Sequence, residues 1–132
     1  MCLVTKMIAP RRATRDIVCY KVLVYNTYSN AYGTPYMGTP VSLGIKLEAK
    51  KESSLLPDTF GKIYGGFFHM YTTKSDASSI VNYWSQYSTK FRTHVFRRCI
   101  IPKGSLYYIS TDKSEICATS IIIGNEGDYD NN

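Results

Sequence analysis

Histidine is scarce in this sequence of 132 residues, and the common catalytic motifs are missing. A metal site would need both histidines, His69 and His94, together with cysteine or carboxylate ligands from elsewhere. The four cysteines form no C-x-x-C pair, which argues against a zinc knuckle. The sequence also lacks a P-loop, a G-x-S-x-G and an H-E-x-x-H pattern. We therefore expect no metal site and no cofactor, and the sequence favours a protein that is not an enzyme.

Long hydrophobic runs are absent as well. The N-terminal residues contain no apolar core of a signal peptide, and no stretch of about 20 apolar residues is present to cross a bilayer. Cys19, Cys99 and Cys117 lie within apolar strand patterns, where a reduced cysteine acts as a small hydrophobe. We therefore expect a cytoplasmic protein with reduced thiols and no membrane partner.

Acidic residues are few outside the C-terminal tail. The tail, residues 124–132, carries three acidic residues and no basic one, which leaves 16 basic and 7 acidic side chains in the rest of the chain, a net charge of about +9. Such a charge favours nucleic acid, nucleotides or an acidic protein as partner, although it also serves simple solubility. We expect a single α+β domain over residues 1–123, with a basic lead-in, and a flexible acidic tail over residues 124–132.

The hydrophobic pattern predicts a sheet with one helix. Apolar side chains at helical spacing predict a helix over residues 75–87, and Thr73 with Asp76 is typical of a helix N-terminus. The apolar stripe of this helix is expected to face the sheet, with Trp84 as its anchor. The predicted fold class is α+β, a single mixed or mainly antiparallel sheet of five to six strands with the helix packed on it. Strands are predicted at residues 16–25, 41–48, 63–71, 93–101, 105–110 and 115–123.

Twelve tyrosines are present, and several lie in the glycine- and proline-containing segment of residues 26–40. We predict a long loop there, bordering the functional face. Tyr32 and Tyr36 are candidate ligand contacts, because tyrosine combines apolar area with a polar tip. Ordinary packing is the alternative interpretation.

Basic and aromatic residues are interleaved around residues 90–98. On a strand, Arg92, His94 and Arg98 fall on one face, whereas Arg97 falls on the other. Together with Lys103 they are candidates for binding phosphate, and a solvated sheet face is the alternative. The full set of candidate ligand-binding residues is Arg92, His94, Arg97, Arg98, Lys103, Tyr32 and Tyr36, to which Arg11, Arg12 and Arg15 are possible additions.

Several segments resemble small uncharacterised proteins of gut Bacteroidales genomes and their phages. The segments are MCL at residues 1–3, DIVCYKVL at 16–23, GGFFHMYTT at 65–73, RRCIIPKGSLYY at 97–108 and CATSIII at 117–123. The resemblance spans most of the chain and brings no known activity. It implies a phage or mobile-element origin, the cytoplasm of the host cell as location, and a role in host takeover or counter-defence.

A second, weaker resemblance is to ADP-ribosyltransferase-type folds. The strand containing Gly66-Phe67, followed by a helix with Ala77 near its start, is similar to an element of that family. The resemblance implies NAD as cosubstrate, Tyr71 as a wall of the nicotinamide pocket, and Glu115 as the glutamate that orients the attacking group. The strand at residues 16–25 departs from the family, because it contains neither the histidine nor the arginine expected to grip NAD.

Three functional hypotheses follow from these observations. The leading one is a non-enzymatic, phage-type accessory protein that binds a phosphate-bearing ligand, a nucleotide or nucleic acid, or an acidic protein of the host. The first alternative is an ADP-ribosyltransferase-like enzyme that uses NAD. The second alternative is a structural or cargo protein of a virion.

Overall fold

The computed structural model describes residues 3–35, 40–49, 56–63 and 67–124. These residues form a ten-stranded sheet, a two-stranded sheet and one helix, and every strand pair among them is antiparallel. The predicted α+β class is confirmed, but five to six strands was too low a number. Most of the additional strands are only two or three residues long, too short to leave a periodic pattern in the sequence.

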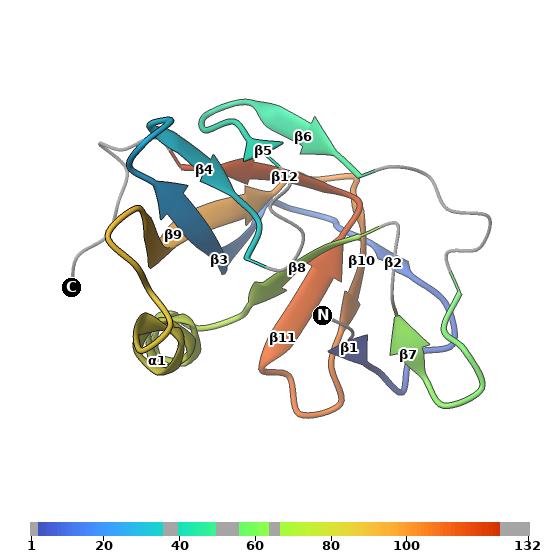
Figure 1. The fold of residues 1–132 in the computed structure, drawn as a ribbon. Coiled ribbons are helices and arrows are strands. Elements are labelled where there is room, and N and C mark those ends of the chain that lie inside the picture. Colours follow the sequence, from blue (N-terminus) through green and yellow to red (C-terminus); the bar gives the residue numbers. More distant parts are fainter. Residues whose placement is uncertain (1–2, 36–39, 50–55, 64–66, 125–132) are drawn as a thin grey trace.

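The large sheet has the order β2-β10-β11-β8-β3-β9-β12-β6, and β4 pairs with both β3 and β5 (Figure 1). β3 and β9 are each ten residues long and pair along their whole length, from Ile17 opposite Ile101 to Asn26 opposite Arg92. The strands of this sheet are β2 (Arg11–Arg12), β3 (Ile17–Asn26), β4 (Ala31–Gly33), β5 (Pro40–Val41), β6 (Lys46–Glu48), β8 (Phe68–Tyr71), β9 (Arg92–Ile101), β10 (Leu106–Ile109), β11 (Glu115–Ala118) and β12 (Ser120–Ile123).

Three predicted elements differ in the structure. The predicted loop at residues 26–40 contains β4, which folds back onto β3 as a hairpin. The predicted strand at residues 41–48 is interrupted around Gly44, whose φ of +75° suits glycine. Its residues therefore contribute to two short strands, β5 and β6, in place of one. The predicted strand at residues 63–71 gives a residue of the two-stranded sheet and then β8, with residues 64–66 outside the described part of the chain.

β11 and β12 are two halves of one segment that bends at Thr119. In β11 the side chains of Ile116 and Ala118 point to the main core, whereas in β12 those of Ile121 and Ile123 do so. The alternation of the strand therefore shifts by one residue at the bend, as at a β-bulge. The bend is held by Thr119, whose backbone N–H donates to the carbonyl of Leu106 at 3.0 Å.

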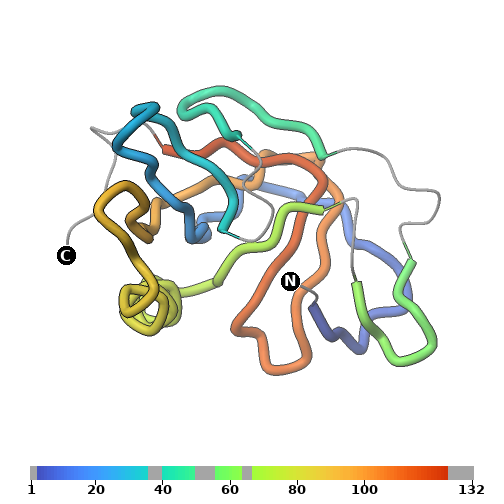
Figure 2. Tube along the Cα trace, in the orientation of Figure 1, coloured from blue at the N-terminus to red at the C-terminus, as the bar shows by residue number. Residues whose placement is uncertain are grey.

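The bend makes the sheet curl around the main core. β11 pairs with β8 and β12 pairs with β9, while β8 and β9 both pair with β3. Figure 2 shows the red C-terminal segment running up the molecule and then turning across its top. The residues enclosed by these strands are Cys19, Leu23, Met70, Cys99, Ile101, Ile116, Ala118, Ile121 and Ile123.

A second, smaller core lies on the outer side of β10 and β11. It is covered by the two-stranded sheet of β1 (Leu3–Val4) and β7 (Lys62–Ile63), and it contains Leu3, Ile63, Phe67, Tyr108 and Cys117. Gly61 is required beside it, because its φ is +76° and a Cβ there would lie 2.4 Å from the carbonyl oxygen of Thr5. Figure 1 shows this sheet and the helix on opposite sides of β8 and β11.

The helix α1 (Lys74–Ser85) begins as predicted, since the hydroxyl of Thr73 accepts the backbone N–H of Asp76 at 3.2 Å. It contacts β9, β3 and β8. Only Ala77 of this helix is buried. Trp84, the predicted anchor, is 41 % exposed and contacts β9 through the ring of His94, so it covers less of the sheet than expected. No helix in the described ranges has the length and apolar character needed to span a membrane.

Candidate functional site

The structure separates the predicted phosphate-binding residues into three places. Arg92, His94 and Arg98 share the outer face of β9, on the side where α1 packs, as the strand alternation predicted. Arg92 is exposed, whereas His94 and Arg98 are half-buried. Arg92 is thus the cation of this group that is open to a ligand.

Arg97 lies on the inner face of β9 and is 5 % exposed. Its Nη2 donates to the hydroxyl of Tyr32 at 2.7 Å, and its guanidinium lies over the Tyr32 ring. Lys21 of β3 is the direct cross-strand partner of Arg97 and is buried to a similar extent. Its Nζ donates to the carbonyl of His69 at 3.0 Å. Arg97 and Tyr32 therefore join a buried polar group and not the outer basic face, and Tyr36 lies outside the described residues.

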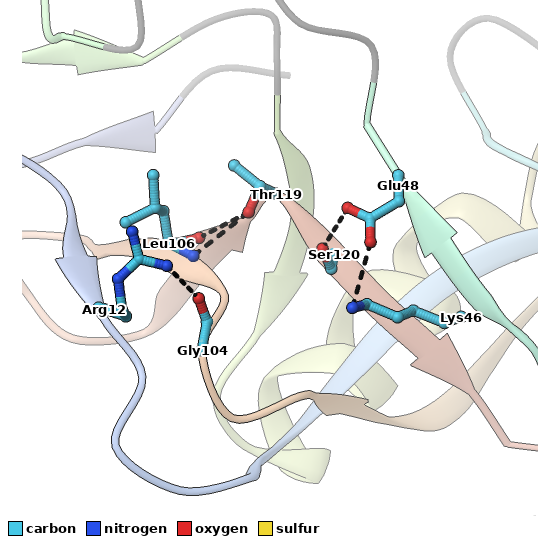
Figure 3. Close-up of polar contacts among 7 residues, drawn as sticks. All are labelled: Arg12, Lys46, Glu48, Gly104, Leu106, Thr119 and Ser120. Atoms are coloured by element: carbon cyan, nitrogen blue, oxygen red, sulfur yellow. Dashed lines mark hydrogen bonds and ion pairs between the residues drawn. The ribbon is translucent and has the colours of Figure 1, made fainter.

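Lys103 belongs to a third place, at the opposite end of β9 from Arg92. The ten residues of β9 span about 30 Å, too far for one phosphate to contact both side chains. The backbone N–H of Lys103 donates to a carboxylate oxygen of Asp16 at 2.8 Å. Figure 3 shows the neighbouring contact, in which Arg12 donates to the carbonyl of Gly104 at 2.7 Å.

Exposed aromatic side chains gather at the C-terminal end of α1. Tyr83, Trp84 and Tyr87 contact one another with ring centroids 5.4 to 6.2 Å apart. The sequence interpretation assigned Trp84 and Tyr87 to the apolar stripe that packs on the sheet, and it did not single out Tyr83. The available signal was Tyr83, a large aromatic residue that lies outside the apolar stripe of the helix and is therefore expected on its surface.

Trp84 is held against the strand by His94. The two rings stack with centroids 6.0 Å apart and an interplanar angle of 20°. The Nδ1 of His94 lies 3.0 Å from the hydroxyl of Ser88, which fixes the imidazole. Burial and, to a smaller extent, the charge of Arg92 lower the pKa of His94, so the neutral imidazole is favoured at neutral pH. His94 therefore acts as an uncharged ring that stacks on Trp84, and it adds no positive charge beside Arg92.

A second aromatic pair adjoins the same stretch of chain. Phe91 and Tyr28 meet edge to face at 5.8 Å, and Tyr28 is 86 % exposed in the turn between β3 and β4. The backbone N–H of Thr27 donates to the carbonyl of Phe91 at 2.9 Å, which joins this turn to the segment before β9. The Nζ of Lys90 lies 5.8 Å from the centre of the Phe91 ring.

We name this surface the aromatic–basic face. Its members are Tyr28, Tyr83, Trp84, Tyr87, Lys90, Phe91, Arg92 and His94. The sequence contains no aspartate or glutamate between Asp16 and Glu48 or between Asp76 and Asp112. These two stretches supply every member of the aromatic–basic face, and Asp76 belongs to the opposite end of α1. The face is therefore cationic without acidic residues nearby in the sequence.

A different pair of predicted residues is brought together on β8 and β11. Tyr71 and Glu115 are direct partners across these strands, and Tyr20 of β3 faces Tyr71 on its other side. Burial, followed by the charge of Asp112, raises the pKa of Glu115. Burial also raises the pKa of Tyr71, with smaller effects from Glu115 and Asp76. The three side chains thus form one row across three strands.

Within the described ranges, histidine, cysteine and carboxylate side chains form no group of three or more that would suit a metal ion. The chain was compared with protein-family models, with curated proteins and with solved structures, and none of these comparisons gave a match.

Proposed function

We propose that this chain is a non-enzymatic accessory protein that binds a phosphate-bearing ligand, a nucleotide or nucleic acid, through its aromatic–basic face. The observation that supports this proposal most is the exposure of Lys90 and Arg92 beside open aromatic rings, in stretches of sequence without carboxylates. Cations in such a setting attract phosphate, and rings provide surface for a base. The resemblance to phage proteins supports a role in host takeover or counter-defence.

Charge reversal at Lys90 and Arg92 tests where the ligand binds. The double variant Lys90→Glu/Arg92→Glu is expected to lose most of its affinity for oligonucleotides, because two phosphate contacts become repulsive. The slope of the logarithm of the binding constant against that of salt concentration should also become shallower by roughly 1 to 2. Fluorescence anisotropy with a labelled oligonucleotide at several salt concentrations measures both quantities.

The matched control is Arg15→Glu/Lys103→Glu, which changes the net charge by the same amount near the opposite end of β9. This variant should keep nearly wild-type affinity at moderate salt. If the control variant loses binding and the Lys90/Arg92 variant keeps it, the ligand site lies at the other basic region and the proposed location is wrong.

A second candidate function, an ADP-ribosyltransferase-like enzyme that uses NAD, is favoured by the row of Tyr20, Tyr71 and Glu115. In this proposal Tyr71 borders the nicotinamide and Glu115 orients the attacking group. The row lies beside the first turn of α1, since Asp76 is close enough to affect the pKa of Tyr71. Groups with perturbed pKa values, such as Glu115 and Tyr71, are concentrated at functional sites in proteins.

Glu115→Gln distinguishes the two candidate functions. If the chain is a transferase, this variant should lose roughly 10²- to 10⁴-fold in the rate of label transfer from NAD, because the carboxylate no longer assists the attacking group. Glu48→Gln, at a glutamate on β6, serves as the control and should transfer at the wild-type rate. Equal transfer by the wild type and Glu115→Gln would remove the proposed role of Glu115.

A further inference from the structure

The aromatic rings at the end of α1 remain largely open to solvent, although Trp84 stacks on His94 of β9. Of the twelve residues of the helix only Ala77 is buried, while Tyr83, Trp84 and the nearby Tyr87 are between 41 % and 58 % exposed. Large aromatic side chains on a surface without a structural role mark interaction sites. The described residues include six such exposed aromatic side chains, and five of them, all except Phe60, belong to the aromatic–basic face.

The rings are also held in place before any ligand arrives. Trp84 stacks on His94, and the hydroxyl of Ser88 fixes His94 by contacts with both its ring and its backbone N–H, at 3.0 and 3.4 Å. Tyr83 and Tyr87 each contact the Trp84 ring. A ring array fixed in this way loses little conformational freedom on binding, which favours affinity.

The cations lie along the chain next to the two ring groups. Lys90 lies between Tyr87, which follows α1, and Phe91, and Arg92 follows Phe91 as the first residue of β9. Phe91 contacts Tyr28 and the ammonium group of Lys90. An occupant that complements this order has flat apolar groups on either side of a negatively charged link. Bases joined by a phosphodiester have that order, and base stacking on aromatic side chains tolerates any sequence.

We propose that the ligand of the aromatic–basic face is single-stranded nucleic acid, with bases stacked on the rings of α1 and on the Tyr28–Phe91 pair and the intervening phosphates on Lys90 and Arg92. This inference rests on the proposed function and names its ligand class. Bases in a duplex are already stacked on one another, so their faces are closed to the rings. A mononucleotide has a single base, whereas the two ring groups provide stacking surface for more than one.

Trp84 is the only tryptophan of the chain, so its fluorescence reports directly on this surface. The test titrates the full chain with a single strand of about ten nucleotides, the matching duplex, and inorganic polyphosphate. We expect the single strand to quench Trp84 and to bind more tightly than the duplex. Polyphosphate, which has charge but no bases, should bind more weakly and leave the fluorescence nearly unchanged.

Ring deletions test the stacking separately from the charge. Tyr83→Ala, Tyr87→Ala and Tyr28→Ala should each weaken binding of the single strand by about 5- to 150-fold, whereas binding of polyphosphate should not change. Phe60→Ala removes an equally exposed ring outside the face and should bind like the wild type. Because these side chains are open to solvent, melting temperatures close to that of the wild type are expected to show that every variant is folded.

The outcomes separate this inference from the proposed function. If the Lys90/Arg92 reversal weakens binding and the ring deletions do not, phosphate binding stands and the stacking of single strands is overturned. The same holds if the duplex or polyphosphate binds as tightly as the single strand. If no nucleotide, oligonucleotide or polyphosphate binds, both proposals fail; poly-glutamate binding in that case would indicate an acidic protein as partner.

Discussion

Lys21 places an ammonium group on the inner face of β3, where the side chain is 6 % exposed. Burial lowers the pKa of Lys21, since it disfavours the charged form. The titratable groups that affect the pKa of Lys21 are the thiols of Cys19 and Cys99, and burial raises the pKa of Cys99 to about 12 and also raises that of Cys19. These thiols therefore stay protonated and give Lys21 no negative partner at neutral pH.

The pH dependence of stability follows from the lowered pKa of Lys21. Between that lowered pKa and the value of about 10.4 in the unfolded chain, the unfolded state binds more protons than the folded state. The contribution of Lys21 to the free energy of unfolding therefore increases as the pH rises. Lys21→Met lacks this gain. Urea unfolding from about pH 7 to about pH 10 should therefore show the wild type improving relative to Lys21→Met.

Thiols and tyrosines also titrate at high pH, but both proteins contain them, so their effect is absent from the difference in the free energy of unfolding. Lys6→Met, at an exposed lysine, is the control and should follow the wild type at every pH. A constant difference between the wild type and Lys21→Met over this range would mean that Lys21 is not desolvated as the structure indicates.

At the scale of single elements, the hairpin between β10 and β11 depends on Asp112. One carboxylate oxygen of Asp112 accepts from the hydroxyls of Ser110 and Ser114, each at 2.7 Å, and from the backbone N–H of Ser114 at 3.0 Å. Lys113 takes a φ of +66° to close the turn. The hydrogen bonds from Ser114 and Ser110 lower the pKa of Asp112 to about 2.

Asp112→Asn is expected to change how the protein responds to acid. The stabilisation by the Asp112 carboxylate is fully present above the unfolded pKa of about 3.9 and is lost as the pH falls through the lowered pKa. Between about pH 5 and about pH 2, the melting temperature of the wild type should therefore fall more than that of Asp112→Asn. Parallel losses in the two proteins would contradict the role given to this carboxylate.

How far the sequence predicts an element depends on its length. The strands that became β3 and β9, the neighbouring strands that became β10 and β11, and the cap at Thr73 were all predicted from local patterns and are confirmed. β4 was missed because its three residues lie among glycine and proline, and only pairing with β3 makes them a strand. The exposure of Trp84 was not predicted, because helical spacing does not reveal how much of a helix the sheet covers.

The same limit applies to the candidate site. Alternation placed Arg97 opposite Arg92, His94 and Arg98, which the structure confirms, but it does not tell which face is the inner one, because apolar residues follow on both faces. The separation of Arg92 and Lys103 could have been predicted, because the predicted strand at residues 93–101 places them at its opposite ends, as β9 does.

At the scale of the whole molecule, the acidic side chains are distributed unevenly. The stretches without acidic residues include all of β3, β4 and β9. The described carboxylates lie before β3, on β6, before β7, in the first turn of α1, and on β11 and its hairpin. A polyanion approaching the aromatic–basic face therefore meets one sign of charge, which raises association rates at low salt. Glu48 of β6 accepts a hydrogen bond from the Ser120 hydroxyl of β12 at 2.5 Å and pairs with Lys46 at 3.3 Å (Figure 3).

The bend at Thr119 has a consequence for how this chain is free to vary. Exchanges among isoleucine, valine and leucine in β12 keep the same side chains inside, with only a change in volume. Loss or gain of one residue between Ala118 and Ile121 would instead exchange the inner and outer sides of every residue up to Ile123, and with them the contacts to β9 and β6. At this corner of the sheet, what evolution has to preserve is a count of residues more than their identity.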